Sequence, residues 1–121
     1  MINWVNIMRE YALLLSVLCS IGAVSASAAT QCGNASWYEA KSNNSGSFTA
    51  AHRSLPFGSK IQVENLDNGN KAIVEINDRG PFVQGRIIDV SRAAAEQLDF
   101  KGNGIARVRI STVGPSASTC R

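Results

Sequence analysis

Ile76-Asn77-Asp78-Arg79-Gly80-Pro81-Phe82, followed two residues later by Gly85-Arg86-Ile87-Ile88-Asp89-Val90-Ser91, is the stretch that decides the fold. Its second run is short and mostly apolar, which is typical of a strand buried on both faces. Gly80-Pro81 predicts a turn between that strand and the one before it. The stretch therefore predicts two successive short strands, each with an aspartate near its end.

Further short strands are expected on both sides of this stretch. They alternate between apolar and polar residues and are bounded by Gly, Asn or Pro. One pair is joined by Asp67-Asn68-Gly69, a strong hairpin turn. In the last strand, Arg107 and Arg109 share one face, and Ala106, Val108 and Ile110 share the other. The expected strands are Asn34–Tyr38, Ile61–Asn65, Lys71–Ile76, Arg86–Val90 and Ile105–Val113.

One helix is expected, over Arg92–Leu98, with Ser91 as its N-cap and Gly102 beyond its end. Many short strands and one helix within about 90 residues predict a mainly β protein, a small barrel.

The first 29 residues differ from the rest of the chain. Tyr11–Val24 is an uncharged apolar run that follows Arg9 and precedes Ser25-Ala26-Ser27-Ala28-Ala29. This order predicts a signal peptide over residues 1–29, cleaved after Ala28 or Ala29, and one exported domain over residues 30–121. The alternatives are a buried helix or a membrane anchor, but the run is shorter than the ~20 residues of a spanning helix.

The cysteines predict a disulfide. Cys19 lies in the leader, and Leu18 stands where a lipidation motif needs a small residue, so lipid anchoring at Cys19 is not expected. Cys32 and Cys120 remain in the domain and are expected to pair in an oxidising compartment, either the periplasm or the cell exterior. The alternative is two unpaired thiols.

The net charge of +3 favours an acidic surface or polymer as partner. Nucleic acid is not expected, because no cluster of Lys and Arg is interleaved with aromatic residues as stacking on single strands requires. His52 is the only histidine, so a His-rich metal site is excluded and neither a metal nor a cofactor is expected. We expect a monomer without a stable membrane span.

Six blocks of sequence carry a family resemblance across nearly the whole domain. They are Ala35-Ser36-Trp37-Tyr38, Thr49-Ala50-Ala51-His52, Leu55-Pro56-Phe57-Gly58, Asn65-Leu66-Asp67-Asn68-Gly69 and the two blocks quoted at the outset. In this order they resemble the rare-lipoprotein-A (RlpA-like) family. The resemblance implies a six-stranded double-psi β-barrel with one short helix. It also implies a lytic transglycosylase that acts on peptidoglycan glycan strands and leaves 1,6-anhydro-muramyl ends.

The segment before the second block departs from the family pattern. Family members have a longer segment there, with a Gly-Glu pair, whereas here it is only Glu39–Phe48, and Ser47 stands where the glutamate is expected. This departure supports an alternative function, a non-catalytic, expansin-like module that binds and loosens wall polysaccharide.

Two aspartates are the candidate acids. In a lytic transglycosylase the sugar's own 6-hydroxyl is the nucleophile, so one carboxyl group can serve first as acid and then as base. The resemblance ranks Asp89 first, with Asp78 as its partner. Each has a structural alternative: Asp78 closes a turn and pairs with Arg79, or Asp89 binds backbone N–H groups at the helix entry.

The remaining candidates would contact substrate. His52 is expected to hydrogen-bond a sugar or orient an aspartate, and its alternative is a hydrogen-bonded turn histidine. Trp37 and Tyr38 could stack on sugar rings, but strand alternation sends them to opposite faces, so one of them belongs in the core. Asn77 and Arg79 are the polar candidates beside Asp78.

Overall fold

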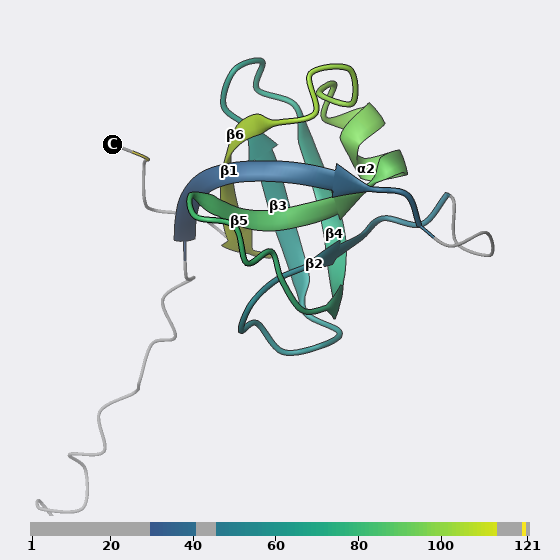
Figure 1. The fold of residues 1–121 in the computed structure, drawn as a ribbon, viewed down its shortest axis with the longest axis vertical. Helices are drawn as coiled ribbons and strands as arrows, with labels where there is room; N and C mark the ends of the chain where they lie inside the picture. Colours follow the sequence, from purple (N-terminus) through teal and green to yellow (C-terminus); the bar gives the residue numbers. More distant parts are fainter. Residues whose placement is uncertain (1–29, 41–45, 114–119, 121) are drawn as a thin grey trace, which may run out of the picture.

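The computed structural model describes residues 30–40, 46–113 and 120, which form six strands and one short helix (Figure 1). The strands close into a barrel in the order β1-β5-β2-β4-β3-β6. This confirms the predicted mainly β, six-stranded double-psi barrel. The elements are β1 Thr30–Tyr38, β2 Thr49–Ala51, β3 Lys60–Asn65, β4 Lys71–Asp78, β5 Arg86–Ser91, α2 Arg92–Gln97 and β6 Ala106–Thr112.

The barrel combines two parallel strand pairs with four antiparallel ones. β1 runs parallel to β5, and β2 runs parallel to β4. Each parallel pair contains a register shift, at Asn34/Ala35 and at Ala50/Ala51 respectively. β2 is also antiparallel to β5. It therefore lies between β4 and β5, the two strands that carry Asp78 and Asp89.

Two strand predictions need correction. No strand was predicted at Thr49–Ala51, because three residues are too few to show the alternation that identifies a strand. β1 begins at Thr30, four residues before the predicted start at Asn34. These four residues lack an apolar pattern, and they are strand because they pair antiparallel with β6, from Thr30 opposite Ser111 onward.

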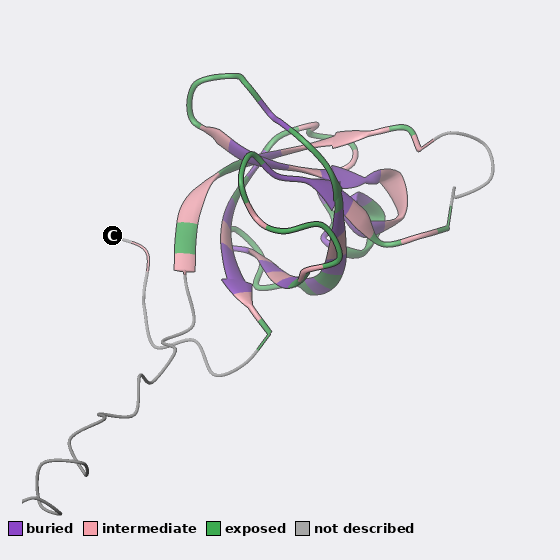
Figure 2. Ribbon diagram, turned by 90° about the horizontal axis from the view of Figure 1, so that it is seen from below, coloured by how far each residue is buried: buried purple, intermediate pink, exposed green. Residues whose placement is uncertain are grey.

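The buried residues of the barrel are mostly aliphatic, and they lie along its strands (Figure 2). In β3 and β4 every second residue is buried, as the sequence predicted. Gly33 is required by close packing, because a Cβ there would lie 2.7 Å from Cγ2 of Ile87. The largest fully buried side chains are Phe100, Ile61, Ile76, Ile88, Leu98, Val63, Val74, Val90 and Val108.

The β3–β4 hairpin is confirmed, and Gly69 has the positive φ of +80° that such a turn requires. Ser91 does occupy the N-cap position of α2, but its hydroxyl makes no capping hydrogen bond. Instead, the Ser91 hydroxyl donates to the Ser47 carbonyl at 2.7 Å and accepts from the Thr49 N–H at 3.3 Å. The predicted capping role is therefore wrong, because the Ser91 hydroxyl forms its hydrogen bonds with β2 and with the segment before it.

Replacing Asn65 by Ala is expected to lower the free energy of unfolding by about 1–3 kcal/mol, because the two hydrogen bonds of this buried side chain are lost. Asn65 is 3% exposed. Its amide donates to the Leu98 carbonyl at 2.9 Å, and its oxygen accepts the Asp67 N–H at 3.0 Å. Asn68→Ala is the matched control, since exposed Asn68 donates to the same carbonyl at 3.0 Å. Urea denaturation checks this, and an equal loss in both variants would contradict it.

The predicted disulfide is present. Cys32 and Cys120 are bonded, with their Cα atoms 5.9 Å apart and a sequence separation of 88 residues. The predicted signal peptide and Cys19 lie outside the described residues. In the part of the chain that the structure describes, no helix is long and apolar enough to cross a membrane.

Candidate functional site

Asp78 and Asp89 flank the same residue of the central strand. Asp78 is the last residue of β4, and Asp89 lies within β5. Ala51 of β2 is in register with Asp78 on one side and with Asp89 on the other. Because neighbouring strands lie about 4.8 Å apart, the two aspartate Cα atoms are roughly 10 Å apart. The fold therefore brings the two candidate acids into one row.

Asp89 is held by an arginine of its own strand. Nη2 of Arg86 lies 2.8 Å from Oδ1 and 2.9 Å from Oδ2 of Asp89. The Asp89 side chain is 21% exposed and that of Arg86 is 25% exposed, so this ion pair is partly shielded from water. In the described part of the chain the carboxylate accepts no hydrogen bond from a backbone N–H at the start of α2. A purely structural role at the helix entry is therefore not what its contacts indicate. Nε of Arg86 is buried without a partner among the described residues.

Asp78 is more accessible. Its Oδ1 accepts the N–H of Arg79 at 2.8 Å, which is the turn-closing contact that the sequence suggested. The expected ion pair with the Arg79 side chain is absent. That guanidinium instead donates to the Leu55 carbonyl at 2.8 Å and to the His52 carbonyl at 3.2 Å. Exposed Asn77 precedes Asp78 on the same rim of the barrel.

Both ring nitrogens of His52 are engaged. Nδ1 accepts the backbone N–H groups of Ser54 and Leu55, each at 3.1 Å. Nε2 lies 3.0 Å from Oε1 of Gln31. Because Nδ1 accepts two hydrogen bonds, Nε2 carries the proton and donates to the glutamine. The ring therefore ties the turn after β2 to the start of β1, which is the geometry of a turn histidine.

The environment of His52 disfavours its charged form. Burial lowers the pKa of the imidazole, and the positive charges of Arg79 and Arg53 lower it further. The backbone N–H of His52 also donates to the Asp78 carbonyl at 3.1 Å. This neutral histidine thus fixes the backbone beside one of the two aspartates.

The stability of the protein is expected to fall as the pH drops below about 6.5, the ordinary pKa of histidine. The folded state resists protonation of His52 while the unfolded state does not, so the unfolded chain binds more protons in that range. Chemical denaturation at a series of pH values measures this. His52 is the only histidine. His52→Gln should therefore flatten the dependence just below pH 6.5. A slope that persists unchanged in this variant would assign the effect to other groups.

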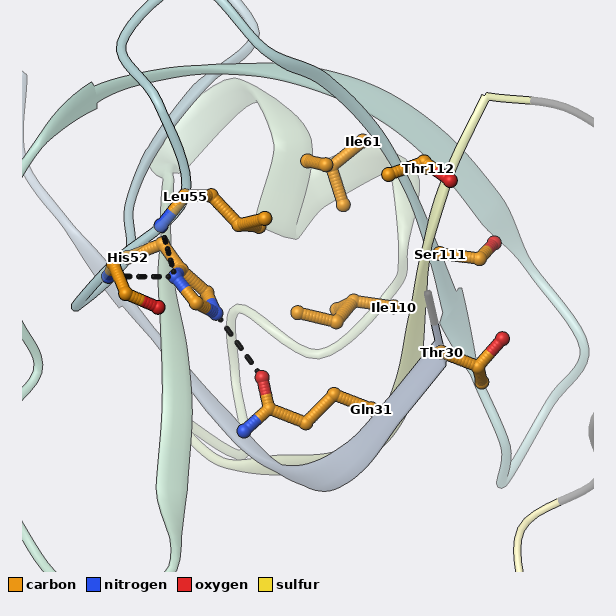
Figure 3. Close-up of a pocket in the computed structure, with 9 residues that line it drawn as sticks. Thr30, Gln31, His52, Leu55, Ile61, Ile110, Ser111 and Thr112 are labelled. Carbon is orange, nitrogen blue, oxygen red and sulfur yellow. Dashed lines mark hydrogen bonds between the residues drawn. The ribbon is translucent and has the colours of Figure 1, made fainter. Parts of the chain in front are cut away.

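A pocket opens beside the histidine at one end of the barrel (Figure 3). Its volume is about 160 Å³, and the side chains of Leu55, Ile61 and Ile110 point into it. The hydrogen bond between His52 and Gln31 forms one edge. Neither Asp78 nor Asp89 lines this pocket, so it is separate from the acidic row.

The two aromatic candidates of β1 have different surroundings. Trp37 packs against the hydrophobic core, and its Nε1–H donates to the Lys101 carbonyl at 3.1 Å. The Tyr38 hydroxyl and Oγ1 of Thr49 lie 2.8 Å apart. Trp37 is therefore the one that faces the core, which leaves Tyr38 as the better-placed candidate for contact with a ligand.

The shortened segment supplies no additional acid at the row. Ser47, in the place of the family glutamate, lends its carbonyl to Ser91. Glu39 is exposed and forms an ion pair with Arg92 at 3.0 Å. Residues 41–45 lie outside the described residues. Within the described ranges, no group of three or more His, Cys, Asp or Glu side chains could hold a metal ion.

Sequence reasoning missed Arg86 and Arg53. Residues three apart in a regular strand face opposite sides, so Arg86 was not expected beside Asp89. The register shift in β5, where Arg86 pairs with Asn34 but Ile88 pairs with Ala35, places both on one side. Arg53 follows His52, and its Nη2 donates to the Arg86 carbonyl at 2.8 Å. Nothing in the local sequence indicates that contact.

The likeness to solved structures is one of fold. An expansin of Clavibacter michiganensis, in a variant crystallised in complex with cellohexaose, matches with a TM-score of 0.58 and 19% sequence identity, over 75% of this chain and 54% of that chain. The Streptomyces papain inhibitor matches with a TM-score of 0.56 and 19% identity, over 69% of this chain and 94% of that chain.

Sequence comparison is more specific. The probable endolytic peptidoglycan transglycosylase RlpA of Treponema pallidum is 57% identical over 70 residues, which are 58% of this chain and 22% of the relative. The endolytic peptidoglycan transglycosylase RlpA of Neisseria meningitidis serogroup B is 46% identical over 99 residues, 74% of this chain and 41% of the relative.

The chain thus spans less than half the length of these curated relatives. The sequence profile of the family described as "Lytic transglycolase" matches residues 30–110, which include all the blocks quoted above. The chain therefore belongs to the RlpA-like double-psi β-barrel family.

Proposed function

We propose that this barrel is a lytic transglycosylase that cuts peptidoglycan glycan strands outside the cytoplasm and leaves 1,6-anhydro-muramyl ends. The observation that carries the proposal is the row Asp78–Ala51–Asp89, in which the two aspartates lie on either side of one short strand. Membership of a family whose curated members are named peptidoglycan transglycosylases supplies the class of substrate.

The proposed reaction needs one carboxyl group that both gives and takes a proton. The bond between C1 of the muramyl sugar and the glycosidic oxygen breaks, and the carboxyl group protonates the leaving oxygen. The same group, now a carboxylate, takes the proton of the 6-hydroxyl as that oxygen bonds to C1. Water is not consumed, and the proton count of the carboxyl group is restored.

Asp89 is proposed as this acid and base, and Asp78 as the neighbouring carboxylate. A negative charge beside C1 stabilises the oxocarbenium-like transition state. Arg86 contacts both oxygens of Asp89, so one of these contacts has to be released before Asp89 can donate a proton. Asp78 needs no such change, because its only hydrogen bond from a described residue uses Oδ1.

The other candidate side chains take supporting roles in this proposal. Tyr38 and Asn77 contact the sugar from β1 and from the end of β4. His52 and Arg79 position the turn beside Asp78, since both hold backbone groups of residues 52–55. Trp37 contributes through packing rather than by stacking on substrate.

A non-catalytic, expansin-like role is the second candidate. Two observations favour it: Ser47 replaces the family glutamate, and Asp89 is neutralised by Arg86. In that case the same row would bind polysaccharide without cleaving it.

Product analysis distinguishes the two functions. The purified protein is incubated with peptidoglycan sacculi, and the soluble products are separated and weighed by mass spectrometry. Release of anhydro-muropeptides supports the transglycosylase. Retention of the protein on sacculi without soluble products supports the binding module instead.

A further inference from the structure

Two loops at one end of the barrel carry exposed apolar side chains. One loop joins β2 to β3, and the other joins β4 to β5 (Figures 1 and 2). Phe57 on the first is 61% exposed, and Phe82 and Val83 on the second are 82% and 52% exposed. Exposed large apolar side chains mark an interaction site where they form one contiguous patch.

Arg53 binds the first loop to the second. Its Nε donates to the Pro81 carbonyl at 2.6 Å. Its Nη2 donates to the carbonyls of Arg86 at 2.8 Å and Val83 at 3.2 Å. One side chain thus binds two carbonyl groups of the loop that carries Phe82 and the carbonyl of the first residue of β5.

Arg79 makes the reciprocal connection, from the second loop to the first. Its Nη1 donates to the carbonyls of Leu55 and His52 at 2.8 and 3.2 Å. The two loops are therefore braced from both sides, and their exposed side chains are held in place before any partner arrives. Such preorganisation reduces the entropy cost of binding.

Each of the two phenylalanine rings lies close to a residue that follows Asp78. The guanidinium carbon of Arg79 is 4.0 Å from the centroid of the Phe57 ring, so it covers one face of that ring and leaves the other exposed. Phe82 folds back toward Gly80, where a Cβ would lie 3.6 Å from its Cε2. The two rings are thus anchored at consecutive residues, immediately after Asp78.

We propose that Phe57 and Phe82 form an aromatic platform, on which sugar rings of the glycan strand stack as the strand approaches the acidic row. Pyranose rings have apolar C–H faces and polar edges. The platform offers both partners: flat exposed rings, and the polar side chains of Asn77 and Asp78 beside them. The identity of the strand rests on the proposed function, whereas the platform itself rests on the geometry of the two loops.

Binding is measured without turnover. All variants carry Asp89→Asn, the substitution expected to abolish turnover, and they are titrated with chitohexaose by calorimetry. The double variant Phe57→Ala/Phe82→Ala should raise Kd at least about tenfold. Aromatic side chains that become buried against a ligand contribute much of the binding energy. Ile73→Ala and Ile105→Ala are matched controls that should leave Kd unchanged, since these residues are 50% and 46% exposed but lie outside both loops. Phe57→Tyr keeps the flat ring and should retain the affinity.

Melting temperatures should be similar in all variants, because both phenylalanines are exposed. An unchanged Kd in the double Ala variant would overturn the platform, as would a failure of the common background to bind chitohexaose. The platform would also be overturned if the background protein sedimented as a dimer and the double Ala variant as a monomer. Phe57 and Phe82 would then form a self-association surface.

The same substitutions in the otherwise unaltered protein separate the platform from the proposed reaction. The expected result is a higher KM on sacculi with kcat unchanged. Anhydro products with the same KM would remove the platform and leave the proposed function intact. If the two Ala substitutions abolish chitohexaose binding while the unaltered protein releases no anhydro products from sacculi, the platform is supported and the proposed function is overturned.

Discussion

Asp89→Asn should abolish the release of anhydro-muropeptides from sacculi, with a fall in rate of about 100- to 10,000-fold, the contribution typical of a positioned acid and base. The amide keeps the size of the side chain and can still accept a hydrogen bond, but it has no proton of the required acidity to give to the glycosidic oxygen. Product formation is followed by liquid chromatography and mass spectrometry.

Two further variants make this result interpretable. Asp67→Asn changes an exposed aspartate in the β3–β4 turn, and it should leave the rate unchanged. Asp78→Asn should slow the reaction without abolishing it, because a charge beside the reacting carbon is lost. Full activity of Asp89→Asn together with an inactive Asp78→Asn would transfer the acid role to Asp78, whose side chain is free of the Arg86 ion pair.

Removing the disulfide should lower the free energy of unfolding by about 4.5 kcal/mol, according to the chain-entropy estimate for a long loop. Cys32 and Cys120 close a loop across 88 positions, which includes nearly all of the barrel. A domain of about 90 residues has little stability in reserve, so this loss would lower Tm by roughly 20 °C.

The measurement compares Cys32→Ser, Cys120→Ser and the double variant with the unaltered protein, with and without a reductant. All three variants and the reduced protein should have the same Tm, because each lacks the same single crosslink. A reductant that leaves the Tm of the unaltered protein unchanged would show that the bond contributes little to stability.

The sequence predicted the parts of the fold that depend on local pattern. β3, β4 and β6 show clear alternation, and Asp67-Asn68-Gly69 specifies its turn, so these strands were placed within two residues of their ends. β2 could not be predicted this way. Its three residues are strand because β4 and β5 pair with both of their edges.

The candidate site was predicted less completely, because its contacts are made between distant segments. The positions of Asp78 and Asp89 at one level of the barrel follow from the placement of β2, which the sequence did not show. The Arg86–Asp89 ion pair depends on a register shift in β5. Arg53 acts on carbonyl groups about 30 residues away along the chain, and backbone acceptors leave no mark in the sequence.

In the proposed reaction the glycan's own 6-hydroxyl, and not water, attacks the reacting carbon. The most direct test is to incubate the protein with sacculi in water enriched in heavy oxygen and to weigh the released muropeptides. The proposed reaction predicts anhydro-muropeptides that contain no heavy oxygen. Products with reducing ends that have taken up heavy oxygen would show hydrolysis, and the proposed transglycosylase reaction would then be wrong.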